Sequence, residues 1–179
     1  MKISREWAMP SPWTFNIKPI RELLERVLAG CSIIVDPFAG KSEWATHSND
    51  LKTSGILARD YLDRLIAEGV VADAVLLDPP YSPRQMTEVY AGMGLKMGSK
   101  GTQNASLYKE SIVRLDKVLR PGGVAIRCGW NSVGFTKTLG YTIEEILLVC
   151  HGGAHNDTIV TVDRKSLVEG DTVGRKTTV

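Results

Sequence analysis

The sequence has few cysteines, and none of them lies in a pattern typical of a disulfide framework or a zinc site. Its 179 residues contain Cys31, Cys128 and Cys150, an odd number without CxxC spacing. This usage predicts reduced, half-buried thiols rather than disulfides or zinc ligands. Because disulfides belong mainly to oxidising compartments, we expect a cytoplasmic protein.

Long hydrophobic runs and a strong net charge are missing as well. No apolar stretch approaches the roughly 20 residues that span a bilayer. Residues 1–20 carry proline, tryptophan and charges where a signal peptide would be apolar. We therefore expect no membrane partner. The net charge of +2 is too small to indicate nucleic-acid binding by itself.

What the sequence does contain is an alternation of helical and strand patterns. Helical spacing of apolar residues follows Pro19 and recurs over 61–68, 84–91, 105–119 and 131–139. Strand patterns cover 32–35, 45–50, 54–58, 72–77, 124–128, 143–150 and 158–163. This order predicts an α/β fold with a mostly parallel sheet, helices on both faces and a C-terminal antiparallel hairpin. We expect one domain over 1–165 and a loose tail over 166–179.

The segment Asp78-Pro79-Pro80-Tyr81 places a carboxylate at the end of an expected buried strand. It follows the apolar run 72–77, and two prolines cannot continue a strand ladder. In open α/β sheets, ligands bind at the carboxyl ends of the strands. The prolines also remove two N–H donors, so the turn offers carbonyl acceptors. Such a turn suits a ligand group that donates protons, for example an exocyclic NH2 group.

Four carboxylates follow expected strands in this way: Asp36, Asp50, Asp60 and Asp78. If the sheet is parallel, all four converge on one edge. Ribose hydroxyls and an adenine amino group are donors that need acceptors, so the set favours an adenosine-containing cofactor. The turn 36–40 also contains small residues, which let a ligand approach the backbone.

Two other patterns do not support a site. Gly40-Lys41-Ser42 is like the end of a phosphate-binding loop, but Val35 stands where that motif has glycine. His151 and His155 have metal-like spacing without a third ligand nearby, so we expect no metal site.

The two strand-end motifs resemble those of a known family. Asp36-Pro37-Phe38-Ala39-Gly40 and Asp78-Pro79-Pro80-Tyr81 are similar to the cofactor and catalytic motifs of the DNA amino-methyltransferases, which use S-adenosylmethionine. The chain most resembles the small DNA N6-adenine methyltransferases of phages and prophages. The shared pattern covers most of residues 5–165 and includes Trp13-Thr14-Phe15, Asn49-Asp50-Leu51 and Gly129-Trp130-Asn131-Ser132.

The resemblance implies a Rossmann-like methyltransferase fold and a role for each matching residue. The cofactor would be bound at its methionine end by Phe15, at its ribose by Asp50 and at its adenine amino group by Asp60. The cofactor loop would consist of Asp36, Pro37, Phe38, Ala39 and Gly40. A flipped adenine, methylated at N6, would be held by Asp78, Pro79, Pro80 and Tyr81.

The sequence departs from the family pattern in two places. Ser42 stands where many relatives have a second glycine, and the chain has no room for a separate target-recognition domain. DNA would then be contacted by basic residues in or near 92–117, namely Arg84, Lys96, Lys100 and Lys109. Such a small surface predicts low sequence specificity or a homodimer. Methyl transfer to RNA, to cytosine N4 or to a protein glutamine stays open, as does an inactive nucleic-acid-binding relative.

Overall fold

The computed structural model describes residues 1–79, 104–153 and 155–167, with the side chains of 104–107 excepted. The described strands form one sheet in the order β1-β6-β7-β5-β4-β2-β3. Only β7 is antiparallel to its neighbours, β5 and β6. The strands are β1 (Lys2–Trp7), β2 (Ile34–Asp36), β3 (His47–Ser48), β4 (Ala72–Leu77), β5 (Leu119–Gly129), β6 (Tyr141–Cys150) and β7 (Thr158–Lys165).

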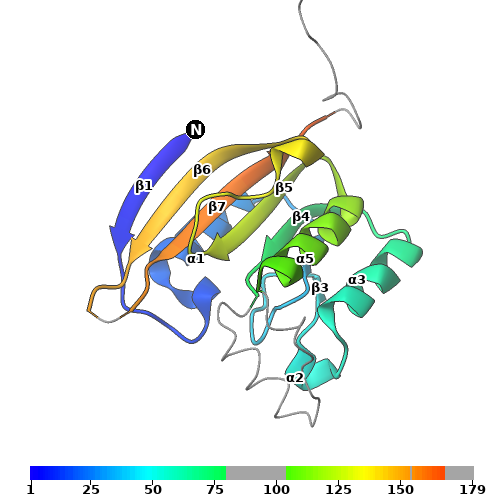
Figure 1. Cartoon of the computed structure of the whole chain (residues 1–179), viewed down its shortest axis with the longest axis horizontal. Helices are drawn as coiled ribbons and strands as arrows, with labels where there is room; N and C mark the ends of the chain where they lie inside the picture. Colours follow the sequence, from blue (N-terminus) through cyan, green and yellow to red (C-terminus); the bar gives the residue numbers. More distant parts are fainter. Residues whose placement is uncertain (80–103, 154, 168–179) are drawn as a thin grey trace, which may run out of the picture.

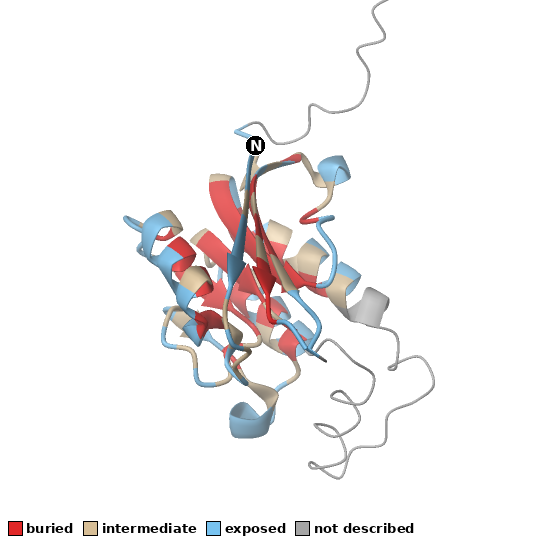
Figure 2. Ribbon diagram, turned by 90° about the vertical axis from the view of Figure 1, so that its left-hand side faces the viewer, coloured by how far each residue is buried: buried red, intermediate tan, exposed pale blue. Residues whose placement is uncertain are grey.

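Helices cover the sheet on both faces (Figure 1), as the sequence predicts. Helix α1 (Lys18–Val27) packs on one face, and α3 (Ala58–Ala67) and α5 (Asn104–Val118) pack on the other. Successive strand residues point to opposite faces, so in β4 Leu76 joins the core beneath α1 and Leu77 joins the core beneath α3 and α5. Figure 2 shows the buried residues gathered between these layers.

Several expected elements are confirmed with small changes of boundary. Pro19 lies in the first turn of α1, where its missing N–H leaves no intrahelical bond unmade. The strands before Asp36 and Asp78 are present, and β6 and β7 form the C-terminal antiparallel pair. The observed architecture is thus the expected mostly parallel α/β fold.

Strand β1 has no counterpart among the sequence predictions. It pairs in parallel with β6, so that Lys2 lies opposite Glu145 and Trp7 opposite Cys150. Most of its residues are exposed, because it forms an edge of the sheet. A strand with so little burial carries no clear apolar alternation, and the predictions relied on that signal.

The strand expected over 54–58 is wrong. These residues complete α2 (Leu51–Ser54) and begin α3, and Gly55 between them has φ +71, a left-handed conformation that ends α2. The strand expected over 45–50 is reduced to the two residues of β3.

The helix expected over 131–139 is also wrong, apart from the 3-10 turn η2 (Lys137–Leu139). Gly134 has φ +65, and a Cβ there would lie 2.5 Å from the carboxylate of Asp163. The chain therefore runs close to β7 in a conformation that a helix does not allow. The turn expected over 120–123 is an irregularity within β5, since Ala72 pairs with Leu119 and Ala74 with Val124.

The expected helix over 84–91, most of the loop over 92–104 and nearly all of the tail over 166–179 lie outside the described residues. Within the part that the structure describes, no helix is long and apolar enough to cross a membrane. All three cysteines are free; Cys31 is partly exposed, whereas Cys128 and Cys150 are more deeply buried than expected.

Candidate functional site

The site lies where the strand order reverses. Strand β2 has β3 on one side and β4 on the other, both parallel to it. The chain thus leaves β2 toward one edge of the sheet and returns on the other side, which is the topological switch point at which open α/β sheets bind ligands. Asp36 is the last residue of β2 and Asp78 directly follows β4. The two carboxylates therefore lie together at the carboxyl ends of the parallel strands, as the sequence analysis expects.

The Asp36 carboxyl is buried, and only one of its two oxygens has a hydrogen-bond partner among the described residues. The backbone N–H of Phe38 donates to its Oδ1 at 2.9 Å. Its Oδ2 has no hydrogen-bond partner among the described residues. Burial raises the pKa of Asp36 to about 8 against the effect of the Phe38 N–H, and the charges of Asp78 and Asp50 raise it further. Much of this carboxyl is therefore protonated at neutral pH.

The Asp78 residue keeps some exposed surface, but its carboxyl is desolvated. This desolvation raises the pKa of Asp78 to about 7, and a hydrogen bond from the Thr14 side chain acts in the opposite direction. Thr14 belongs to the 3-10 turn η1 (Thr14–Asn16), which precedes α1. The segment before α1 thus reaches the end of β4.

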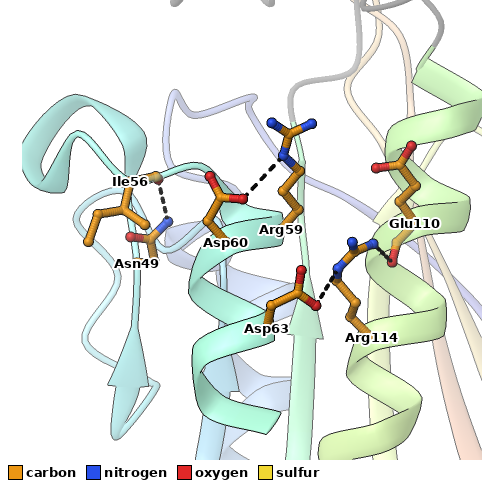
Figure 3. A network of polar contacts seen from close by, with 7 residues as sticks. All are labelled: Asn49, Ile56, Arg59, Asp60, Asp63, Glu110 and Arg114. Carbon is orange, nitrogen blue, oxygen red and sulfur yellow. Dashed lines mark hydrogen bonds and ion pairs between the residues drawn. The ribbon is translucent and has the colours of Figure 1, made fainter. Parts of the chain in front are cut away.

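The loop after β2 is held in place by Asn49, a buried residue just beyond β3. Its N–H donates to the carbonyl of Asp36 at 2.9 Å, and its carbonyl accepts from the N–H of Ala39 at 2.8 Å. Its side-chain amide donates to the carbonyls of Pro37 and Ile56, at 3.4 and 3.1 Å; Figure 3 shows the second of these bonds. Asn49 therefore fixes the shape of the candidate cofactor loop.

Gly40 ends this loop with φ +56 and lies against an aromatic ring. A Cβ at Gly40 would approach Cζ3 of Trp13 to 3.0 Å, and Nζ of Lys41 lies 5.4 Å from the centroid of the same ring. The glycine is thus needed for backbone conformation and for contact with Trp13. Phe15, close by in η1, is buried in the core beneath α1.

Asp50 lies two residues beyond β3 and caps α2, where its side chain accepts from the N–H of Thr53 at 3.2 Å. It is near enough to Asp36 for its charge to raise the pKa of that carboxyl. The sequence analysis expected Asp50 at the strand end itself. The difference is small, because the structure brings Asp36, Asp50 and Asp78 to one edge.

Asp60 does not follow a strand. It lies in the first turn of α3, exposed, and forms an ion pair with Nε of Arg59 at 3.3 Å (Figure 3). Its selection as a strand-end carboxylate was therefore wrong. In Figure 1 the start of α3 lies next to α2, at the end of the molecule toward which the parallel strands point. A role for Asp60 with the cofactor adenine stays a prediction.

The expected base-holding and DNA-contacting residues are described only in part. Pro79 is buried, whereas Pro80, Tyr81, Arg84, Lys96 and Lys100 lie outside the described residues. Lys109 is exposed on α5. Arg114, also on α5, donates to Asp63 of α3 at 2.9 Å (Figure 3), which links the two helices.

The sequence analysis names Thr14, Asn49 and His151 but did not predict their supporting roles. His151 has Nδ1 2.8 Å from the carbonyl of Ala8 and Nε2 2.9 Å from Oγ1 of Thr158. It thus joins the end of β1 to β7 through hydrogen bonds. Within the described ranges no group of three acidic, histidine or cysteine residues could hold a metal ion.

No protein-family model and no curated protein matches the chain. Solved structures do share its fold. One is NSun6 from Pyrococcus horikoshii with SFG, at 17% identity and a TM-score of 0.50 over 82% of this chain. The chain spans about half of that protein, 51% of its length.

A second structure with this fold is the 1,6-didemethyltoxoflavin-N1-methyltransferase of Burkholderia thailandensis, solved with 1,6-didemethyltoxoflavin and S-adenosylhomocysteine. It is 14% identical, with a TM-score of 0.51 over 83% of this chain and 77% of its own. At these identities the likeness shows the fold alone. That fold is the Rossmann-like α/β fold of methyltransferases.

Proposed function

We propose that the chain is an S-adenosylmethionine-dependent methyltransferase that acts on the exocyclic N6 of adenine in DNA. The observation that carries the proposal is the pair of desolvated carboxyls, Asp36 and Asp78, on either side of the switch point. The two relatives of like fold were solved with SFG and S-adenosylhomocysteine, which supports the cofactor. The resemblance of the Asp78–Tyr81 motif to that of amino-methyltransferases supports the amine as acceptor.

The residues at the end of β2 fit an adenosine-containing cofactor. Asp36 has a buried carboxylate oxygen without a partner among the described residues, and a ligand hydroxyl or amine would satisfy it. Asp50 is half-buried and near enough for its charge to act on Asp36, and Gly40 allows the tight turn that Asn49 holds. Asp36, Phe38 and Gly40 would hold the cofactor, with Asp50 on its ribose. When bound, S-adenosylmethionine supplies an electrophilic methyl group.

Asp78 and Pro79 would activate the target nitrogen. The lone pair of adenine N6 is delocalised into the ring, which makes the nitrogen a poor nucleophile. If the ionised Asp78 carboxylate and the Pro79 carbonyl each accept one N6 hydrogen, a pyramidal nitrogen is favoured and its lone pair becomes available. Thr14 keeps one Asp78 oxygen oriented while the amine is held. The nitrogen would form a bond to the methyl carbon as the carbon–sulfur bond of the cofactor breaks, with S-adenosylhomocysteine as the leaving group. The methylated nitrogen would then lose a proton to solvent and become neutral.

The target base must leave the duplex to reach Asp78, at a cost of a few kcal/mol. Tyr81 would stack on the flipped base and offset roughly 1–3 kcal/mol of that cost. The largest contribution would come from alignment of the reacting groups, for which well-oriented systems gain up to about 7–11 kcal/mol. This is why the rigid ends of β2 and β4 suit the reaction.

The proposal is tested by methyl transfer to defined substrates. Purified protein is incubated with methyl-tritiated S-adenosylmethionine and unmethylated DNA, and the digested nucleosides are identified by mass spectrometry. The expected product is N6-methyladenine. N4-methylcytosine, or label only in RNA or protein, would overturn the substrate while keeping the enzyme class.

A control for cofactor binding separates an enzyme from an inactive binding protein. Calorimetry should detect binding of S-adenosylmethionine to the wild type and a much weaker interaction for Asp36→Ala. Binding without transfer to any of these substrates would overturn the proposed reaction. Absence of binding would overturn the proposed cofactor.

A further inference from the structure

A buried arginine supports the loop that follows β5. Arg127 is only 7% exposed, and its Nη1 donates to Oδ1 of Asn131 at 3.0 Å and to the carbonyl of Gly134 at 3.4 Å. Oδ1 of Asn131 also accepts from the N–H of Val133 at 3.3 Å. The guanidinium thus holds both ends of the loop 131–134, in place of the helix that the sequence favours.

Arg127 is in turn fixed by residues from α5 and β7. Its guanidinium carbon lies 4.6 Å from the ring centroid of Tyr108. The carboxylate of Asp163 accepts from the N–H of Phe135 at 3.2 Å. Burial raises the pKa of Asp163 to about 6, and the positive charge of Arg127 acts in the opposite direction. Burying a guanidinium is costly unless it is paired and hydrogen-bonded. The two Nη1 bonds meet that condition in part, whereas Nε of Arg127 and Oδ2 of Asp163 have no hydrogen-bond partner among the described residues. The two bonds favour one conformation of the loop.

Trp130 begins this loop and leaves 52% of its surface exposed. It directly follows β5, which is the parallel neighbour of β4, and Arg127 pairs with Leu77. Asp78 and Trp130 therefore both lie just beyond this pair, on strands about 5 Å apart. The charge of Asp78 also reaches Tyr108, whose hydroxyl donates to the carbonyl of Cys128 at 3.1 Å. The register thus brings Trp130 to the same end of the sheet as Asp78.

We propose that Trp130 is a stacking platform for a nucleobase of the substrate strand, beside the base held at Asp78. The inference rests on the proposed function, because it takes the substrate to be a nucleic acid. A flipped or single-stranded base has lost its stacking neighbours, and an aromatic side chain can replace one of them. Because Arg127 and Asn131 already hold the loop, little conformational entropy is lost on binding.

If Trp130 stacks on a nucleobase, its contribution to binding affinity should depend on the bases of the nucleic-acid strand and not on its sugar-phosphate backbone. Binding of a labelled single-stranded oligodeoxyadenylate and of an abasic strand of equal length is measured by fluorescence anisotropy at fixed salt. Trp130→Ala should weaken binding of the oligodeoxyadenylate roughly 5- to 150-fold and leave binding of the abasic strand unchanged. Trp130→Phe should retain most of the affinity.

Two further variants separate stacking from folding. Trp7→Ala removes a tryptophan that is more exposed than Trp130, on β1, which β6 and β7 separate from β5, and it should change neither affinity. Asn131→Ala removes one of the two hydrogen bonds from Arg127 to the loop. It should weaken binding of the oligodeoxyadenylate by a smaller factor than Trp130→Ala, again without effect on the abasic strand.

The possible results distinguish the stacking role of Trp130 from the proposed function on which it rests. Equal affinity of the wild type and Trp130→Ala for oligodeoxyadenylate would overturn the platform alone, as would an equal loss on both strands. If the wild type binds no oligonucleotide, the proposal of a nucleic-acid substrate is wrong, and so is the stacking role of Trp130. If Trp130→Ala instead changes the oligomeric state, measured by sedimentation, the residue serves contact between copies of the chain.

Discussion

Asp36 and Asp78 carry the same functional group at the ends of neighbouring strands, yet their surroundings favour different tasks. Asp36 is buried with one oxygen unpartnered among the described residues, and its pKa is raised to about 8. Asp78 has a pKa of about 7 and receives a hydrogen bond from Thr14. The charge of Asp78 raises the pKa of Asp36, so ionisation of Asp78 favours the protonated form of Asp36. Asp78 is the one that ionises first and can accept protons from an amine.

Replacing Asp78 should separate turnover from cofactor binding. Asp78→Ala removes the carboxylate proposed to hold the amine, so kcat should fall by roughly a hundred- to a thousandfold, by analogy with other lost electrostatic contacts at reacting groups. The dissociation constant for S-adenosylmethionine should change only a few-fold. Single-turnover methyl transfer and calorimetry measure the two quantities. Losses of similar size in both would contradict the assigned role.

Thr14 sets the pH at which Asp78 becomes active. Its hydrogen bond favours the charged carboxylate, so Thr14→Val should raise the pKa of Asp78 above about 7. Activity that needs the ionised form should rise with pH through that pKa, and the acid limb of kcat should move to higher pH in the variant. Thr14→Ser keeps the hydroxyl and should retain the wild-type profile. A loss in Thr14→Val that is the same at every pH would point to a purely structural role.

Among the elements, the loop after β2 depends on a residue from the next strand. Asn49 supplies backbone and side-chain bonds to residues 36–39 and to Ile56, and its Oδ1 accepts from Ser54 at 2.8 Å. The amide of Asn49 thus contacts the loop, the last residue of α2 and the segment that leads to α3.

Asn49→Ala should therefore destabilise the protein and weaken cofactor binding together. Leaving buried carbonyls without their donor costs about 1–3 kcal/mol, and urea denaturation followed by circular dichroism would measure the loss. The matched control is Asn156→Ala, which removes an exposed asparagine from the β6–β7 connection and should be nearly neutral. Equal stability of the two variants would contradict the role of Asn49.

Comparison of the observed and expected elements shows which sequence patterns were sufficient to predict a strand or a helix. The strands before Asp36 and Asp78 were predictable because both are apolar runs that end in proline turns. The edge strand β1 was not, since its pairing with β6 depends on residues far away in the chain. The expected helix over 131–139 failed because Arg127 and Asp163, from two strands, bind its backbone. The side chains that support the site come from such distant contacts, and local periodicity does not encode them.

At the scale of the whole molecule, Asp36 links stability to pH. Its pKa is 3.8 in an unfolded chain and about 8 in the fold, so the folded protein retains a proton that the unfolded chain releases between these values. Its stabilising contribution is fully present below about pH 4 and is lost as pH rises through about 8.

Asp36→Asn should flatten this dependence. Each unit of pKa difference corresponds to about 1.4 kcal/mol. Between pH 5 and pH 8.5 the free energy of unfolding should therefore decrease in the wild type, and this decrease should be smaller by a few kcal/mol in the variant. Urea titrations at the two pH values measure the difference. Glu43→Gln, at an exposed position, serves as the charge control. A slope like that of the wild type would contradict the buried, protonated state of Asp36.

The placement of β1 has a consequence for how the protein forms on the ribosome. Residues 2–7 complete the sheet only by lying beside residues 145–150, and Ala8 is joined to His151. Strand β1 is synthesised well before β6 and must therefore wait for it before the two can pair. Because such distant pairing is slow, the switch-point half of the sheet can assemble first, and a nascent chain that stops before β6 keeps an unpaired N-terminal arm.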